Sequence, residues 1–414
     1  MGFILVGIFA VSAKYAPAPL VQWAKSVHPI TGSTNCTTRE CLAIMFVFRI
    51  ILANVMYHTL HMVLLVKVTS TSDPRSHVQN AGWWIKGLLL LGIIVAMFFV
   101  PAQQLEPFPV VSFVFTTLFL LMQTFLLVDF AHSWAERCLI RYEETQGVFW
   151  KLALITVTVF CYGFTIAGIT LLYVAITPTS ATVAILRGPS CWISSFSIST
   201  FLILNLLQTF LSVHPTIRKH NSKSGLLQSA IIAVYTTYLL VSALGTDPFQ
   251  CGGSVVTSIG GGTAPMPDTS AGGGGDPTLV RLATIGGAIL SLLALSYSAF
   301  GTASTQFFLA LAPSNPNLSS GSSSSSSRST DDDETQQVNY SYSFFHFTFA
   351  IASFYLGVLV TDWITYASDE VLALPVALRS LAPVWVKLGS GWMVIMLYLW
   401  TLVAPIVLPN RDFS

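Results

Sequence analysis

Apolar residues occur in ten runs along the 414-residue sequence, separated by shorter polar stretches. Nine of the runs are long enough for a helix to cross a bilayer, which needs about 20 mainly apolar residues. The first run is shorter because it meets Lys14, whose side chain must extend to the membrane surface if this run is also a span. The pattern predicts an all-α polytopic membrane protein with about ten transmembrane helices. The predicted spans are Gly2–Ala13, Leu42–Val66, Trp83–Val100, Val110–Trp134, Trp150–Ile176, Trp192–Val213, Leu226–Leu244, Leu279–Phe300, Ser343–Trp363 and Val384–Leu408.

One stretch, Val110–Glu144, continues beyond its apolar part without Gly or Pro, through Asp129, His132 and Glu136. As a single helix it would extend about 52 Å, at 1.5 Å per residue. The hydrocarbon core of a bilayer is only about 30 Å thick. This stretch therefore predicts a long helix that either tilts strongly or projects into the cytosol.

The composition supports a membrane protein, since 53% of the residues are hydrophobic and only 9% are charged. Soluble domains carry about 25% charged residues. A net charge of +1 argues against nucleic acid as a partner. Met1–Ala13 lacks a basic leading segment and an A-x-A cleavage site, so a cleavable signal peptide is not expected.

The distribution of Lys and Arg predicts which side of the membrane each loop faces. Placing both termini in the cytosol gives the inner loops eleven of these residues and the outer loops seven. Arg137 and Arg141 are then inner residues, Lys387 is counted with an outer loop, and Arg49 lies inside a span. We therefore expect both termini to be cytosolic.

Four cysteines, Cys36, Cys41, Cys191 and Cys251, fall in the predicted outer loops. The lumen and the exterior permit disulfides, so these residues are disulfide candidates. Three pairings are open to four cysteines, and four separate thiols are the alternative.

The same outer side holds the glycosylation motif Asn35-Cys36-Thr37. Asn317 and Asn339 also begin such motifs, but the predicted topology places them in the cytosol. We therefore expect glycan on Asn35 alone.

Two low-complexity loops divide the chain. Residues 1–311 would hold eight membrane helices and an outer Gly/Thr/Pro-rich loop at 252–277. Residues 312–338 are Ser-rich and are predicted to form a disordered cytosolic loop. Residues 339–414 would hold the last two helices and a short cytosolic tail. The acidic run Asp331–Glu334 in the cytosolic loop is either a sorting-adaptor or kinase-regulated signal or a solvated linker.

Several polar residues are predicted at membrane depth, where they are costly and need partners. Asp129, His132 and Glu136 share one helical face. With residues at the inner ends of other spans they could form one hydrogen-bonded ring, which is either a cleft for a zwitterionic headgroup or a structural clamp. The predicted ring is Asp129, His132, Glu136, Lys86, His58, His61, Gln228, Tyr342 and His346.

A second predicted polar site lies toward the outer leaflet. Arg49 is deep within its span, and Asp362 lies at a similar depth, so the two are expected to pair. The pair is either a binding site for a headgroup phosphate or a structural contact. Single polar residues in other spans are expected to form interhelical hydrogen bonds. These residues are Asn54, Gln123, Asn205 and Gln208.

No enzyme motif is present. The sequence contains no HExxH, GxSxG, phosphate-binding GKS/T loop or CxxC, and no paired carboxylates within one apolar span. We therefore expect a non-enzymatic protein with no cofactor and no bound metal.

Five stretches resemble signatures of the serine incorporator (Serinc) family, and NAGWWIK at 80–86 is a looser match. The resemblance runs in register from about Cys41 to Ser414. The sequence departs from the family in lacking a Cys-rich segment before the first span and in having Asp362 where Asn or Ser is usual. The five signatures are LVDFAHSW (127–134), SGLLQS (224–229), YTTYLLVSAL (235–244), YSYSFFHF (340–347) and WTLVAPIVLPNRDFS (400–414).

The resemblance implies ten transmembrane helices in two bundles bisected by a long diagonal helix, which would be Val110–Glu144. It implies a protein that brings serine to phosphatidylserine and sphingolipid synthesis, with membrane lipids and serine as ligands. One alternative is a non-selective phospholipid scramblase, and another is a structural protein that recruits adaptors. The expected location is the endoplasmic reticulum and Golgi or the plasma membrane, and a homo-oligomer is compatible with the sequence.

Overall fold

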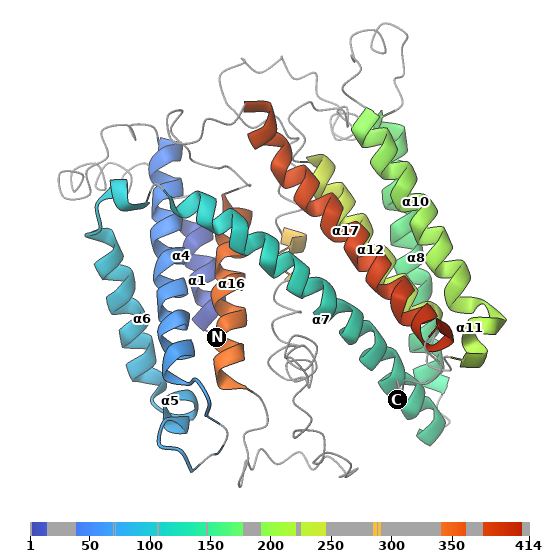
Figure 1. Cartoon of the computed structure of the whole chain (residues 1–414), viewed down its shortest axis with the longest axis horizontal. Helices are drawn as coiled ribbons and strands as arrows, with labels where there is room; N and C mark the ends of the chain where they lie inside the picture. Colours follow the sequence, from blue (N-terminus) through green and yellow to red (C-terminus); the bar gives the residue numbers. More distant parts are fainter. Residues whose placement is uncertain are drawn as a thin grey trace, which may run out of the picture. The chain divides into compact units, whose positions relative to one another are not determined.

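The computed structural model is built from helices throughout the residues that it describes (Figure 1). The helices are α1 (Gly2–Lys14), α4 (Arg39–Leu64), α5 (Ser76–Asn80), α6 (Trp83–Phe98), α7 (Phe108–Thr145), α8 (Val148–Ile176), α10 (Trp192–Val213), α11 (Pro215–His220), α12 (Leu226–Gly245), α16 (Tyr342–Val360) and α17 (Val376–Val407), with a 3-10 turn at Ala102–Leu105. The structure describes residues 2–14, 39–68, 70, 72–105, 107–145, 148–176, 192–220, 225–245, 285–287, 289–290, 341–361 and 376–407.

Seven of the described helices are long and apolar enough to cross a membrane. Two shorter apolar helices, at Phe3–Ser12 and Trp83–Phe98, match two more predicted spans. The predicted span Leu279–Phe300 lies mostly outside the described residues. The chain is therefore an all-α, multi-pass membrane protein. The seven long spans are Ala43–Leu64, Phe108–Glu144, Val148–Val174, Trp192–Val213, Leu226–Leu244, Tyr342–Val360 and Leu381–Val407.

The long helix predicted at Val110–Glu144 is confirmed as α7, which has 38 residues. Pro109 lies in its first turn, where a missing N–H is tolerated, and no other Gly or Pro follows within the helix. At 1.5 Å per residue α7 is about 57 Å long. It is thus nearly twice as long as a hydrocarbon core is thick, about 30 Å.

The helix α6 ends at Phe98, two residues before the predicted end of its span. Pro101 explains the difference, since a proline disfavours helical backbone in the residue that precedes it and cannot donate a helical hydrogen bond. The 16 residues of α6 are therefore fewer than the roughly 20 of a typical span.

The helix α17 begins at Val376, before the predicted start at Val384. This start corrects the assignment of Lys387 to an outer loop, because Lys387 lies within α17 and is only 2% exposed. Its ammonium group donates a hydrogen bond to the backbone oxygen of Ser242 on α12, at 3.0 Å. This hydrogen bond stabilises the buried ammonium group, so a lysine can lie within the apolar helix.

The chain forms two compact units, and neither is continuous in sequence. Unit 1 comprises Met1–Phe119 and Ser291–Thr361, and unit 2 comprises Leu120–Leu290 and Asp362–Ser414. The helix α7 therefore contributes its first part to unit 1 and its remainder to unit 2.

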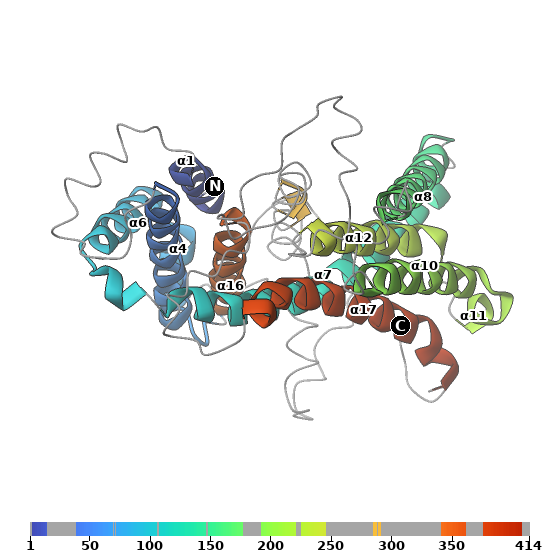
Figure 2. The same cartoon turned by 90° about the horizontal axis from the view of Figure 1, so that it is seen from above.

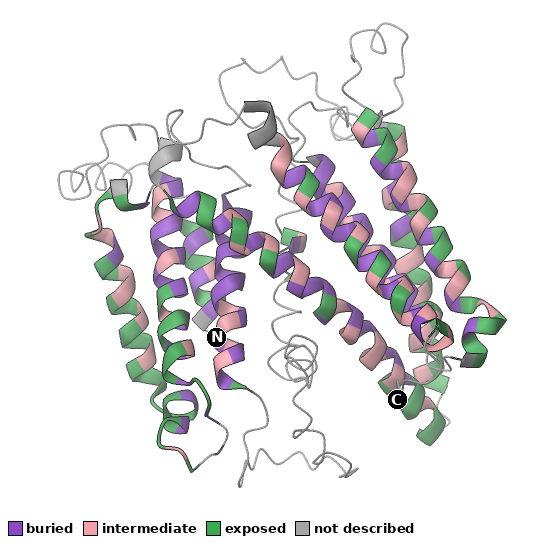
Figure 3. Ribbon diagram, viewed as in Figure 1, coloured by how far each residue is buried: buried purple, intermediate pink, exposed green. Residues whose placement is uncertain are grey.

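Unit 1 is centred on the pair α4 and α16, with α1 packed against both and α6 against α4. Aromatic contacts fix the first part of α7, including Phe115 stacked on Phe354 with ring centroids 4.7 Å apart. A Cβ on Gly357 would lie 3.1 Å from Ile51, so the small residue allows α16 and α4 to approach closely. Figure 3 shows α16 mostly buried and α6 mostly exposed.

Unit 2 is centred on α12, which packs against α8, α10 and α17. Figure 2 shows α10 and α12 running side by side. Val128 of α7, Tyr235 of α12 and Tyr398 of α17 belong to one buried apolar cluster. A Cβ on Gly391 of α17 would lie 2.6 Å from the ring of Phe201 on α10, so this position requires glycine.

Candidate functional site

Two histidines join α4 to α16 inside unit 1. The Nδ1 atoms of His58 and His346 are 2.9 Å apart, and both rings are buried. The other nitrogen of His346, Nε2, is 2.9 Å from the side-chain oxygen of Gln79 on α5. Three helices are thus linked by two consecutive hydrogen bonds.

The hydrogen-bond partners determine which ring nitrogens carry hydrogen. A carbonyl oxygen can only accept, so His346 donates Nε2–H to Gln79. A neutral His346 then has an unprotonated Nδ1, which accepts from Nδ1–H of His58. His61 likewise donates Nδ1–H to the backbone oxygen of Tyr57, at 2.9 Å. Neutral His58 and His61 therefore each keep an unprotonated Nε2, which can accept a hydrogen bond.

The three histidine rings also pack on one another. The rings of His61 and His346 are stacked at 4.9 Å between centroids. The ring of His58 stacks on Phe349 at 5.3 Å. We call His58, His61, His346 and Gln79 the histidine cluster.

The short helix α5 connects the histidine cluster to two further predicted residues. The Lys86 ammonium donates to the backbone oxygen of Gln79 at 2.6 Å and lies 4.3 Å from the centroid of the Trp83 ring. The Asn80 amide donates to the hydroxyl of Tyr342 at 3.1 Å. The sequence analysis missed Gln79 and Asn80, although Asn80 begins the NAGWWIK motif.

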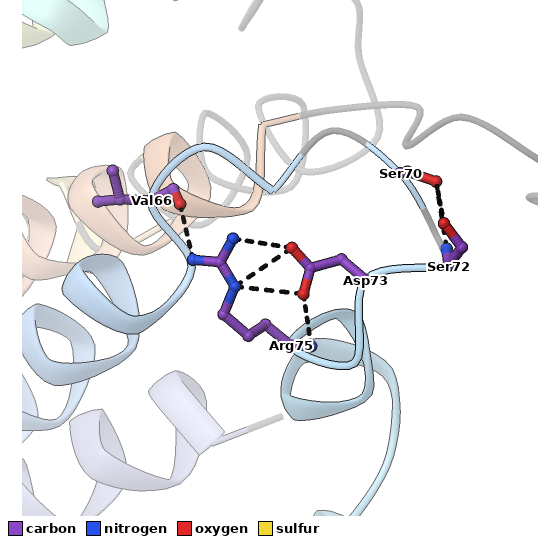
Figure 4. Close-up of polar contacts among 5 residues, drawn as sticks. All are labelled: Val66, Ser70, Ser72, Asp73 and Arg75. Atoms are coloured by element: carbon purple, nitrogen blue, oxygen red, sulfur yellow. Dashed lines mark hydrogen bonds and ion pairs between the residues drawn. The ribbon is translucent and has the colours of Figure 1, made fainter.

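The loop before α5 is fixed by an ion pair that Figure 4 shows. Arg75 contacts the Asp73 carboxylate, with a closest distance of 2.8 Å, and also donates to the backbone oxygen of Val66 at 3.1 Å. The hydrogen bonds from Arg75 lower the pKa of Asp73, and the same contact raises the pKa of Arg75. We call Val66, Asp73 and Arg75 the loop clasp, because it ties the end of α4 to the start of α5.

Arg49 is buried as predicted. Its recorded hydrogen bonds are to backbone oxygens, and its guanidinium also lies 5.9 Å from the centroid of the Phe98 ring. Its two terminal nitrogens donate to the carbonyl oxygens of Phe98, at 2.9 Å, and Val100, at 3.1 Å. These carbonyls lie at the C-terminal end of α6, which carries partial negative charge. Asp362, the predicted partner, lies outside the described residues.

The nine residues of the predicted ring belong to two units. Lys86, His58, His61, Tyr342 and His346 are in unit 1, where the contacts above bring them together. Asp129, His132, Glu136 and Gln228 are in unit 2. There, the hydroxyl of Thr401 on α17 is 3.4 Å from Nε2 of His132, and Asp129 and Glu136 are half-buried.

Three of the four single polar residues form the expected interhelical hydrogen bonds. Asn54 donates to Ser353 at 2.7 Å, Asn205 accepts from Thr236 at 3.2 Å, and Gln208 lies 3.4 Å from the backbone oxygen of Ser229. The side-chain oxygen of Gln123 is buried without a hydrogen-bond partner in the described part of the chain.

Other predicted sites lie beyond what the structure describes. Asn35, Cys36, Cys191, Cys251 and the acidic run Asp331–Glu334 are outside the described residues, and Cys41 lies in α4 with its side chain not described. Within the described ranges, no three or more His, Cys, Asp or Glu side chains are grouped to hold a metal ion.

Comparison with known proteins gives one consistent result. The model of the serine incorporator (Serinc) family matches residues 3–411. A probable serine incorporator of Nematostella vectensis is 34% identical, with 100% of this chain and 90% of the relative aligned. Serine incorporator 3 of Bos taurus is 33% identical over 93% of this chain and 84% of its own length, and serine incorporator 2 of Homo sapiens is 30% identical over 84% and 74%.

Proposed function

The chain belongs to the serine incorporator family, and from this premise we propose that it facilitates the incorporation of serine into membrane lipids. It would act without catalysis, by binding serine or a lipid headgroup and presenting it to the synthesis of phosphatidylserine and sphingolipids.

The histidine cluster and Lys86 carry this proposal, because together they offer both halves of a site for a zwitterion. The unprotonated Nε2 atoms of His58 and His61 are acceptors suited to an ammonium or hydroxyl group. The Lys86 ammonium has three hydrogens and makes one recorded hydrogen bond, to Gln79. It can therefore donate to a carboxylate or phosphate.

The competing interpretation is a structural clamp, in which these same contacts only hold α4, α5 and α16 together. Interhelical polar contacts in membranes often serve only packing. The two interpretations differ in one respect. Among the described residues, the recorded contacts of the Lys86 ammonium are with Gln79 of α5 and Trp83 of its own helix, so a clamp that joins α4 to α16 does not need its positive charge.

The proposal includes a membrane arrangement. In this proposed arrangement the protein has ten transmembrane helices in two bundles bisected by α7, and both of its termini are in the cytosol. The protein would act in the endoplasmic reticulum and Golgi or at the plasma membrane, where lipid substrates are present.

Serine incorporation into lipid tests the proposal in cells that lack other members of the family. Lys86→Met removes the charge and keeps most of the apolar stem. Loss of a charge-assisted hydrogen bond, about 1.5–3 kcal/mol, would reduce labelled serine in phosphatidylserine by roughly tenfold or more. Lys151→Met is the matched control, since Lys151 is an exposed lysine near the start of α8. An unchanged rate in Lys86→Met at equal protein level would favour the clamp.

Phospholipid scrambling is a second candidate function, which the length of α7 and the half-buried Asp129, His132 and Glu136 near its end favour. A tilted helix with a polar face would offer headgroups a path through a thinned bilayer. In liposomes containing the purified protein, dithionite would then bleach more than about half of a fluorescent lipid, the outer-leaflet share. If neither assay responds, recruitment of adaptors through 312–338 becomes the better proposal.

A further inference from the structure

A second polar group lies inside unit 2, on the inner faces of α8, α10 and α12. Its amides and most of its hydroxyls are buried, and Gln208, Ser229 and Thr236 are each 0% exposed. None of its members carries a charge at neutral pH. We call it the polar centre, and it consists of Tyr162, Asn205, Gln208, Thr209, Ser212, Ser229 and Thr236.

The orientation of the two amides follows from their contacts. The backbone oxygen of Phe201 can only accept, so it fixes the amide nitrogen of Asn205, at 2.8 Å. The side-chain oxygen of Asn205 then accepts from the amide nitrogen of Gln208, at 2.7 Å. The orientation of the Gln208 side-chain amide is therefore fixed, and its oxygen must accept a hydrogen bond from another donor.

That donor is not supplied by the residues that the structure describes. The side-chain oxygen of Gln208 is buried and has no hydrogen-bond partner among them. A buried acceptor without a partner is rare in folded proteins, and an ordered water commonly explains an exception.

The hydroxyl groups cannot fill this need, because they are themselves short of hydrogens. Thr209 donates its one hydrogen to the backbone oxygen of Asn205, at 2.8 Å, so its 3.0 Å contact with Tyr162 uses the tyrosine hydrogen. The 2.7 Å contact between Tyr162 and Ser229 then uses the serine hydrogen. No hydroxyl hydrogen of Ser229 then remains for its 3.1 Å contact with the backbone oxygen of Leu226. Any other assignment moves the missing hydrogen to a different contact.

A further hydroxyl lies beside the polar centre. Tyr398 of α17 is 0% exposed and its hydroxyl lies near that of Ser229, but it has no hydrogen-bond partner of acceptable geometry among the described residues. Polar groups that face each other beyond hydrogen-bond geometry are typically bridged by water or by a ligand atom.

We propose that the polar centre is a binding site for a small neutral hydroxyl donor, which donates to Gln208 and bridges Ser229 and Tyr398. The ligand is neutral because the polar centre consists of uncharged amides and hydroxyls, and a buried ion without a charged partner is costly. Two sources provide such a donor: water, and the hydroxymethyl group of a small solute such as serine. The site itself needs no serine handling, so it stands independently of the proposed function.

X-ray radiolytic labelling of the full-length protein in lipid nanodiscs tests the site. Radiation makes hydroxyl radicals from water, so a buried side chain is modified only if a bound water lies next to it. We expect mass spectrometry to find Tyr398 modified, although it is fully buried, and Phe119 unmodified. Phe119 is the internal control, because it is also 0% exposed but packs against Tyr355 in unit 1.

Variants locate the donor at Gln208. Gln208→Met removes the acceptor with little change in volume, and we expect modification of Tyr398 to fall to the level of Phe119. Asn54→Leu, which removes a buried interhelical amide in unit 1, should leave Tyr398 modification unchanged. If Gln208→Met does not fold, as judged by size-exclusion chromatography, the wild-type comparison of Tyr398 with Phe119 decides alone.

Serine and alanine identify the source of the hydroxyl group, because alanine lacks it and is otherwise alike. A drop in Tyr398 modification with serine but not alanine assigns the site to a solute hydroxyl, and no change with either assigns it to water. Both results support a hydroxyl-donor site. The proposal is overturned if wild-type Tyr398 is no more modified than Phe119, or if modification persists in folded Gln208→Met.

Discussion

The two units of the protein each bury a polar group, but they build it from different chemistry. In unit 1 the histidine cluster uses ionisable rings near the ends of α4 and α16 and reaches the loop helix α5 through Gln79. In unit 2 the polar centre uses neutral amides and hydroxyls along three long helices. The histidine cluster has unprotonated ring nitrogens that can accept hydrogen bonds. The polar centre has too few hydroxyl hydrogens to supply all of its short contacts.

This difference indicates where each unit can tolerate change. The histidine cluster lies next to a loop, so a ligand or a rearrangement can be accommodated by movement of α5. The polar centre depends on close approach of helices, in which Phe201 both supplies the backbone acceptor for Asn205 and packs its ring against Gly391. We therefore expect unit 2 to be disturbed by small changes in packing and unit 1 by changes in its polar side chains.

The largest effect is expected for Gly391→Ala, which challenges the packing of unit 2. The new Cβ would lie 2.6 Å from two carbons of the Phe201 ring, so the ring or the helix must move. Overpacking typically costs roughly 1–3 kcal/mol, and we expect the upper end because Phe201 is fully buried. Thermal unfolding in nanodiscs measures the loss.

Two glycines provide matched controls for that substitution. Gly389→Ala places a Cβ with nothing within 4 Å and should be neutral or slightly stabilising. Gly357→Ala in unit 1 places its Cβ 3.1 Å from Ile51, a longer distance than the 2.6 Å at Gly391, and should cost less than Gly391→Ala. An equal loss at Gly357 and Gly391 would contradict the contrast between the units.

A smaller effect is expected for His346→Leu, which removes the middle of the histidine cluster. His58 loses its acceptor and Gln79 its donor, and each lost hydrogen bond is worth about 1 kcal/mol. The double variant with His58→Leu should lose less stability than the sum of the two single variants. In each single variant one imidazole of the His58–His346 pair is left without the other, and in the double variant both imidazoles are absent. Strict additivity in the double-mutant cycle would show that the 2.9 Å contact contributes nothing.

The smallest effect is expected at the loop clasp, where Asp73→Asn removes the negative partner of Arg75. Because Arg75 lowers the pKa of Asp73, the clasp stabilises the fold fully above the unfolded-state pKa of Asp73. That stabilisation is lost as the pH falls through the lower folded-state pKa. The protection factors of amides 72–76, which correct for the intrinsic pH dependence of exchange, should therefore fall in acid in the wild type and be low at every pH in Asp73→Asn.

A second exposed ion pair is the control for the clasp. Arg141 and Glu144 lie 3.8 Å apart, three positions from each other on α7 in unit 2, and both side chains are exposed. Glu144→Gln should leave local amide exchange nearly unchanged, since exposed pairs of this kind contribute little. Equal changes at both pairs would mean that the bond from Arg75 to Val66 does not matter.

Much of the fold was predictable from the sequence, because the length of an apolar run limits where a membrane helix begins and ends. The span at Trp192–Val213 agrees with α10 to the residue, and Val110–Glu144 lies within α7. The site was less predictable. Gln79 sits in a polar loop segment, and its contact with His346 joins residues 267 positions apart, so no local pattern marks it. Lys387 was assigned to an outer loop because it is charged. In the structure its ammonium donates a hydrogen bond to a backbone oxygen of α12 inside unit 2.

The interleaving of the two units has a consequence for biosynthesis. When the ribosome has made residue 290, all of the sequence of unit 2 up to Leu290 exists, yet α16 of unit 1 has not been translated. The side of α4 that carries Ile51, Asn54 and His58 then has no partner from α16 and faces lipid or a chaperone of the membrane. A nascent chain stalled at that point would expose a buried amide and a buried imidazole within the bilayer. We expect these polar groups to mark such a chain as incompletely folded until α16 inserts.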